Sequence, residues 1–180
     1  GLALLGMNVI DIGEVSTPVL NYAVHCDGKA DCGIMVTASH NAKEYNGFKI
    51  VVRDQVIAGE MLQTVKQLML SDITSHCQSG EISYCDIASN YLKAITASCS
   101  PKKASKIVID CGNSVVGPLA LSLFKQLEYE VIPLFCQPDG NFPNHDPNPS
   151  DENNLQALQA AVLSNKADLG LAFDGDGDRL

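Results

Sequence analysis

The sequence predicts an α/β protein made of two consecutive α/β domains, with mixed or parallel sheets sandwiched by helices. Short apolar strand patterns alternate with segments of helical spacing along the chain. In the second half the order is strand, helix, strand, helix, strand, which implies a parallel sheet with right-handed crossovers. The small, polar stretch 98–105 separates the two patterned halves. We therefore expect one domain over residues 1–100 and another over 101–180.

In the first half, the pair Thr17-Pro18 is typical of an N-cap followed by proline at the first helical position, so a helix should run from there toward Cys26. A polar loop, 38–47, lies between two dense apolar runs. Strands are expected at 8–12, 32–37 and 48–52, and further helices at 59–70 and 86–97.

The second half has the clearer pattern. Strands are expected at 106–110, 130–134 and 168–173, and helices at 118–127 and 152–163. Ligands of parallel α/β sheets gather beyond the carboxyl ends of the strands. Asp110-Cys111-Gly112-Asn113 and Asp174 to Arg179 both lie at such ends.

The composition is that of an ordinary globular protein. The 180 residues are 46% hydrophobic and 18% charged, enough to bury a core in one large domain or two small ones. No apolar run approaches the ~20 residues of a membrane helix, and residues 1–6 lack the pattern of a signal peptide. The formal charge of -9 argues against nucleic acid as a partner. We expect a cytoplasmic protein that contacts neither nucleic acid nor membrane.

Seven cysteines are present, an odd number, and no two have CxxC spacing. This favours reduced cysteines used as small hydrophobic residues. A zinc site or a disulfide framework is the alternative.

The loop Asp174-Gly-Asp-Gly-Asp-Arg179 follows an apolar strand. Its glycines permit backbone angles that let the carboxylates of Asp174, Asp176 and Asp178 converge, and converging carboxylates need a cation between them. Hard oxygen ligands select Mg²⁺, Mn²⁺ or Ca²⁺. An EF-hand requires glycine where Arg179 stands. A solvated acidic turn is the other reading.

The second loop, Thr37-Ala-Ser-His-Asn41, is followed by Tyr45-Asn-Gly-Phe-Lys49. Ser39 follows an apolar strand and has small or polar neighbours, so it is exposed for phosphoryl chemistry. Taken alone, the segment favours a plain turn, because the adjacency of Ser39 and His40 proves no catalytic pair.

Together, these two loops resemble the alpha-D-phosphohexomutase superfamily. Val108-Ile-Asp-Cys-Gly-Asn113, Pro138-Asp-Gly-Asn-Phe-Pro-Asn-His145 and Ala167-Asp-Leu-Gly170 also match it, so the resemblance spans nearly the whole chain. Within the superfamily, the chain is most similar to bacterial phosphomannomutase/phosphoglucomutase. Three departures are Ala42 in place of proline, Ser114-Val115 in place of a small pair, and Asp146 in place of a second histidine.

The resemblance implies a phosphoserine at Ser39. Its phosphate would pass to a small phosphosugar, a mannose or glucose monophosphate, and a hexose 1,6-bisphosphate intermediate would return the other phosphate to the serine. One Mg²⁺ would be held by Asp174, Asp176, Asp178 and an oxygen of phosphorylated Ser39.

The resemblance also places His40, Lys49 and Arg179 at active-site positions. His40 or Lys49 would polarise, or exchange a proton with, a sugar hydroxyl. The alternatives are a loop-stabilising role for His40 and a solvated strand position for Lys49. Arg179 would bind a phosphate or, alternatively, form a structural ion pair with the aspartates.

The superfamily has four domains, and this chain is expected to cover most of the first two. The parts that select the sugar belong to the other two, so the chain alone should be inactive and the complete enzyme is expected to be a monomer. Three alternatives differ in chemistry: a phosphoglucosamine mutase, a haloacid-dehalogenase-type phosphatase with Asp174 as nucleophile, and a non-catalytic cation-binding module.

Overall fold

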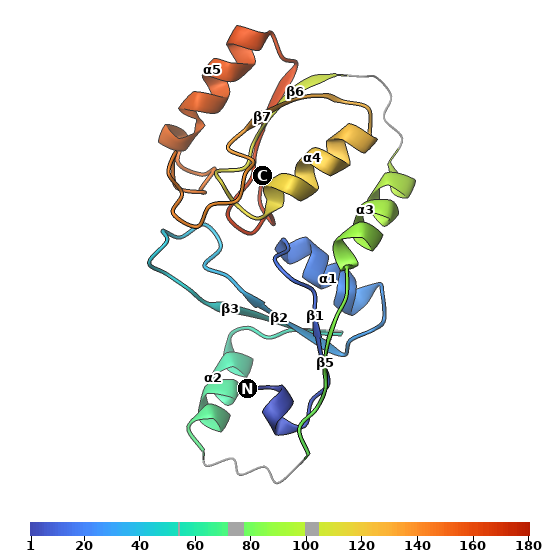
Figure 1. The fold of residues 1–180 in the computed structure, drawn as a ribbon. Coiled ribbons are helices and arrows are strands. Elements are labelled where there is room, and N and C mark those ends of the chain that lie inside the picture. Colours follow the sequence, from blue (N-terminus) through green and yellow to red (C-terminus); the bar gives the residue numbers. More distant parts are fainter. Residues whose placement is uncertain (54, 72–77, 100–104) are drawn as a thin grey trace.

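The first half of the chain contains two small sheets. In this computed structural model, which describes residues 1–53, 55–71, 78–99 and 105–180, the strand β1 (Val9–Asp11) pairs in parallel with β5 (Ile82–Tyr84). The other sheet is antiparallel and has the order β2 (Cys32–Val36), β3 (Phe48–Val52), β4 (Gln55–Val56). In Figure 1 both sheets lie in the lower part of the molecule.

Helix α1 (Thr17–His25) is the centre of this half, because both of its sides are buried. Val19 and Ala23 pack with Ile87 at the start of α3 (Ile87–Ser98), whereas Leu20 and Val24 pack with Val51 of β3. The remaining helical segments are the short 3₁₀ turn η1 (Ala3–Leu5) and helix α2 (Glu60–Met69).

The second half has a parallel sheet with the strand order β7 (Glu130–Leu134), β6 (Lys106–Asp110), β8 (Leu169–Ala172). Helix α4 (Val116–Gln126) covers one face, where Ile107 and Ile109 form a core with Val116 and Ala120. Helix α5 (Gln156–Asn165), which follows the 3₁₀ turn η2 (Glu152–Leu155), covers the other face (Figure 1). Successive side chains of the central strand β6 therefore point toward different helical layers.

The predicted α/β class is confirmed, with a mixed first half and a parallel second half. All six expected strands exist, within one or two residues of the expected ends, and the expected helices are present. Two strands were missed, β4 and β5. The expected N-cap at Thr17 is wrong: Ser16 is the cap residue, Thr17 is already helical, and the Thr17 hydroxyl bonds elsewhere. Most of the proposed boundary at 98–105 lies outside the described residues.

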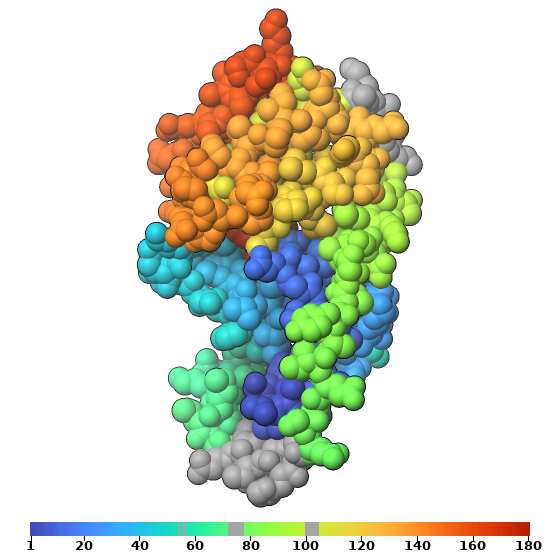
Figure 2. All heavy atoms as spheres, viewed as in Figure 1, coloured from blue at the N-terminus to red at the C-terminus, as the bar shows by residue number. Residues whose placement is uncertain are grey.

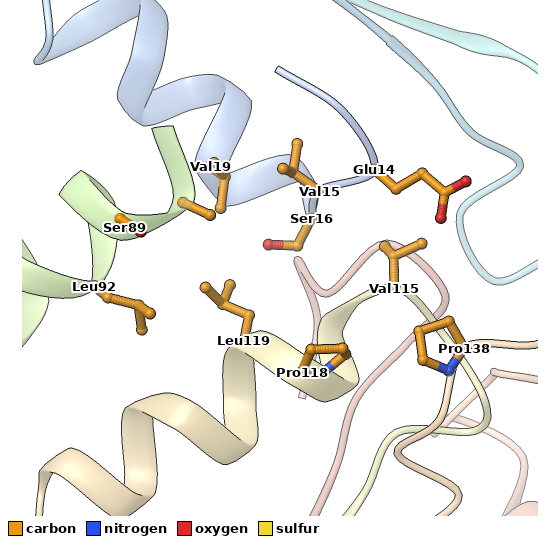
Figure 3. Close-up of a pocket in the computed structure, with 11 residues that line it drawn as sticks. Glu14, Val15, Ser16, Val19, Ser89, Leu92, Val115, Pro118, Leu119 and Pro138 are labelled. Atoms are coloured by element: carbon orange, nitrogen blue, oxygen red, sulfur yellow. The ribbon is translucent and has the colours of Figure 1, made fainter. Parts of the chain in front are cut away.

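The two halves meet along α1, α3 and α4, with α3 packed against both of the other helices. Figure 2 shows the second half (yellow to red) lying directly on the first. At the junction is a cavity of about 300 Å³ with mainly apolar walls that include Val19, Leu92 and Leu119 (Figure 3). The Ser16 hydroxyl lies at its edge and is buried without a hydrogen-bond partner among the described residues. Within the described ranges, no helix is long and apolar enough to cross a membrane.

Candidate active site

Two loops from different halves of the chain meet at one place. The loop with Ser39 leaves the end of β2, and the acidic loop beginning at Asp174 leaves the carboxyl end of β8. Ser39 has a left-handed backbone, with φ of 56°, and its amide donates to Thr37 Oγ1 over 2.8 Å. Ser39 Oγ lies 3.2 Å from Asp174 Oδ2. Residues 135 positions apart in sequence therefore share one site.

The contact between the loops depends on Gly175. A Cβ placed on this residue would lie only 2.1 Å from the backbone oxygen of Ser39 and 3.3 Å from Pro147 Cγ. Carbon and oxygen atoms do not approach so closely, so any side chain here would force the loops apart. The first glycine of the acidic motif is thus needed for close approach rather than for an unusual backbone angle.

Asp174 organises its own loop. Its side chain is fully buried, and its Oδ1 accepts the backbone amides of Asp178 and Arg179 over 3.0 and 3.1 Å. Its Oδ2 faces Ser39 Oγ and the guanidinium of Arg179, with Nε at 3.1 Å and Nη2 at 3.0 Å. Asp174 thus connects the backbone of its own loop with Ser39 and Arg179.

Asp176 joins three elements. Its Oδ2 accepts from Lys49 Nζ on β3 over 2.6 Å and from Thr17 Oγ1 at the start of α1 over 2.7 Å, while its backbone oxygen accepts the Thr17 amide over 2.8 Å. Burial disfavours the charge, but the hydrogen bonds from Lys49 and Thr17 outweigh it and lower the pKa of Asp176. Its other oxygen, Oδ1, is buried with no hydrogen-bond partner among the described residues.

Lys49 lies between two carboxylates. Its Nζ is 2.6 Å from Asp176 Oδ2 and 2.5 Å from Asp178 Oδ2. Partial burial opposes the charge on Lys49, yet the hydrogen bonds to both aspartates raise its pKa. The ammonium group therefore supplies part of the positive charge that converging carboxylates require.

Arg179 connects the acidic loop to the serine loop. Besides its ion pair with Asp174, its Nη2 donates to Ser39 Oγ over 2.6 Å and contacts His40 Nδ1. The side chain is 41% exposed. The ion pair that was the alternative role of Arg179 is present, and the same guanidinium also donates to Ser39 Oγ.

The acidic cluster fits a hard divalent cation. One carboxylate oxygen from each of Asp174, Asp176 and Asp178 lies within 4.8 Å of the others. The partnerless Oδ1 of Asp176 is a second indication, because a buried carboxylate oxygen normally has a hydrogen-bond or metal partner. An all-oxygen set of this kind suits Mg²⁺, Mn²⁺ or Ca²⁺.

Comparison with known proteins now identifies the relatives of the chain. A family profile described as "Phosphoglucomutase/phosphomannomutase, alpha/beta/alpha domain II" matches residues 89–180, and the profile of domain I of the same family matches residues 1–75. The chain belongs to the phosphoglucomutase/phosphomannomutase family.

Several of its relatives are named as phosphohexose mutases. The chain is 46% identical to the phosphomannomutase/phosphoglucomutase of Pseudomonas aeruginosa and 43% identical to a phosphoglucomutase of Neisseria meningitidis, covering 100% and 97% of this chain. A crystal structure of a phosphoglucomutase/phosphomannomutase family protein from Burkholderia thailandensis has a TM-score of 0.93 and 40% identity over 99% of this chain and 40% of its own. The chain spans 38% of the length of the two curated relatives.

The structure brings the seven predicted site residues together, namely Ser39, His40, Lys49, Asp174, Asp176, Asp178 and Arg179. Sequence reasoning did not assign Thr17 to the site. The residue was noticed only as a helix cap, and its partner Asp176 is 159 positions away. The sequence offered one signal for Thr17: it has a hydroxyl group and stands directly before the proline at the start of α1.

Proposed function

We propose that this chain contains the phosphoryl-transfer site of an enzyme that interconverts the 1- and 6-phosphates of a hexose, mannose or glucose, through phosphoserine at Ser39. A hexose 1,6-bisphosphate would be the intermediate. The observation that carries the proposal is the position of Ser39 Oγ, 3.2 Å from Asp174 Oδ2 and 2.6 Å from Arg179 Nη2. The names of the relatives, which include both mannose and glucose enzymes, support the substrate class.

The residues around Ser39 suit a group that alternates between hydroxyl and phosphate. A phosphoserine carries roughly -1.5 to -2 charge and needs cationic donors. Arg179 already donates to the Ser39 oxygen, and a guanidinium offers a fork that matches phosphate. His40 lies beside the same guanidinium. We propose that Arg179 orients the phosphate on Ser39, while His40 or Lys49 handles the proton of the sugar hydroxyl.

We propose Mg²⁺ as the cation, held by Asp174, Asp176 and Asp178, with an oxygen of phosphorylated Ser39 completing the set. When bound, Mg²⁺ neutralises the charge that develops on a transferring phosphoryl group. The chain's own contribution is to position Asp176 through the hydroxyl and the amide of Thr17, while Lys49 balances the charge of Asp176 and Asp178 when no cation is bound.

A phosphatase mechanism with Asp174 as nucleophile is disfavoured. Both oxygens of this carboxylate already accept hydrogen bonds, and the side chain is fully buried. Family membership also argues against it. All six cysteines in the described part of the chain are free thiols, which suits the cytoplasmic location that we propose.

The test is a coupled assay of the complete enzyme with mannose 1-phosphate and glucose 1-phosphate. We expect turnover that requires Mg²⁺ and a bisphosphate activator, and its loss in Ser39→Ala. Wild-type rates in Ser39→Ala would refute the proposal. The 180 residues alone should show no measurable conversion, because productive alignment of a substrate requires both of its ends to be held.

A further inference from the structure

A loop that has no part in the proposed chemistry packs against Gly175 of the acidic loop. It connects β7 to η2 and contains His145, whose ring faces acceptors on two sides. His145 Nε2 lies 3.2 Å from Asp110 Oδ1 and 3.1 Å from Oδ2, and Nδ1 lies 2.8 Å from the backbone oxygen of Asp146. Asp110 is 1% exposed and also accepts the amide of Gly112 over 2.9 Å. The two side chains form a nearly buried ion pair at the carboxyl end of β6.

The surroundings of His145 favour the protonated ring. Both ring nitrogens face oxygen acceptors, which only the imidazolium can satisfy as a double donor. The hydrogen bond to Asp110 raises the pKa of His145 against the opposing effect of burial, and the carbonyl and charge of Asp146 raise it further. The thiols of Cys111, after β6, and Cys136, after β7, are the other titratable groups near Asp110.

Pro147 follows His145 by two residues and packs beside both the turn after β6 and the acidic loop. The ring of His145 packs edge-on against Phe135, with centroids 5.4 Å apart. A Cβ placed on Gly112 would lie 3.2 Å from both His145 Cε1 and Pro147 Cα, so this segment sits tightly on the turn after β6. Pro147 is fully buried, and its Cγ would be 3.3 Å from a Cβ on Gly175. The segment 145–147 thus fills the space between the end of β6 and the acidic loop.

We propose that His145, paired with Asp110, is a positioning residue: it holds Pro147 against Gly175 and thereby keeps the acidic loop in contact with the Ser39 backbone. This inference rests on the proposed function, since the acidic loop is there assigned to Mg²⁺. Pro147 and the Ser39 backbone both adjoin the position that a Cβ of Gly175 would occupy, so the loop has little freedom there while the ion pair is intact. Without the ion pair, Pro147 would be held less firmly. The carboxylates of Asp174, Asp176 and Asp178 would then be close together for a smaller fraction of the time.

The test uses the complete enzyme and two readouts that need no catalysis. The first is amide hydrogen exchange of Asp178 and Arg179, whose amides bond to Asp174 Oδ1. The second is Mg²⁺ affinity by calorimetry. His145→Gln should reduce both, with affinity lowered about 10-fold, the lower end of the usual effect of residues that orient metal ligands. Asp110→Asn should give a similar loss, and the double variant little more. His25→Gln, at the exposed end of α1, is the matched control and should change neither.

The pH dependence distinguishes positioning by an ion pair from packing alone. A raised pKa means that the ion pair contributes fully below about 6.5, the ordinary histidine value, and is lost as pH rises through the higher value in the folded protein. The advantage of wild type over His145→Gln should therefore shrink as pH rises. In wild type, the exchange protection of the Asp178 and Arg179 amides should fall with the same pH midpoint as the ¹⁵N signals of the His145 ring. This comparison uses wild type alone, so it decides the question even if His145→Gln does not fold.

Unchanged protection of Asp178 and Arg179 in His145→Gln, or a loop midpoint unrelated to that of the ring, would overturn the inference. If wild type binds no Mg²⁺, the proposed function fails instead, and the exchange data still decide whether His145 positions the loop.

Discussion

Replacing Gly175 by alanine tests how closely the two loops must approach. The added Cβ would lie 2.1 Å from the Ser39 backbone oxygen, whereas real Cβ contacts are essentially never below 3.0 Å. The loops must therefore separate by about 0.9 Å or more. The φ of Gly175 is not positive, so alanine adds no backbone strain, and the contact with the Ser39 backbone is the severe one. Such overpacking typically costs about 1–3 kcal/mol of unfolding free energy.

The effect on catalysis should be larger than the effect on folding. A displacement of about 1 Å at a reacting group costs roughly 100-fold in rate. We expect kcat/KM of the complete enzyme to fall by about that factor in Gly175→Ala, while thermal unfolding shifts by a few degrees. Gly140→Ala is the control, because nothing lies within 4 Å of its added Cβ and its φ is not positive. Activity of Gly175→Ala within about threefold of wild type would refute the reasoning, since that is only ~0.6 kcal/mol.

Further predictions concern the groups around Asp176. Thr17→Val removes a donor to a buried carboxylate and should lower the unfolding free energy by about 1–3 kcal/mol in urea titrations. Thr17→Ser should keep most of the wild-type unfolding free energy, and an equal loss in both variants would contradict the role of the hydroxyl. Asp176→Asn should weaken Mg²⁺ binding at least about tenfold in calorimetry, ~1.4 kcal/mol; unchanged affinity would remove Asp176 from the ligand set. Lys49→Met should raise Mg²⁺ affinity and destabilise the metal-free chain, because the ammonium competes for the same oxygens; weaker Mg²⁺ binding would show that Lys49 supports the site instead. The difference in unfolding free energy between wild type and Lys49→Met should vanish at both pH extremes. It is lost as pH falls through the lowered pKa of Asp176, because the carboxylate becomes neutral, and as pH rises through the raised pKa of Lys49, because the ammonium does.

The sequence predicted secondary structure best where successive residues of a strand are all buried. Strand β6 is buried along four of its five residues, so its apolar run could be recognised without knowing its partners. The acidic loop was equally readable, because three carboxylates separated by single glycines have few uses other than holding a cation. These two segments indicate from the sequence alone where the second half of the proposed site lies.

Long-range contacts were not readable in the same way. Strand β5 is exposed at all three positions and exists because it pairs with β1, 73 positions earlier, so no local alternation marks it. The role of Gly175 depends on a backbone atom of Ser39, which no local pattern encodes. His145 ends the motif 138–145, which resembles the family without indicating a role for the histidine, and only the geometry connects it to Asp110 and Pro147.

The most direct test of the central claim is the site of phosphorylation in the complete enzyme purified from cells. Intact mass and peptide mapping should find one phosphate on the peptide Thr37-Ala-Ser-His-Asn41, at Ser39, and excess hexose monophosphate should remove it as bisphosphate forms. Phosphate on Asp174, or fully active enzyme with no phosphate on Ser39 at any stage of turnover, would contradict the account.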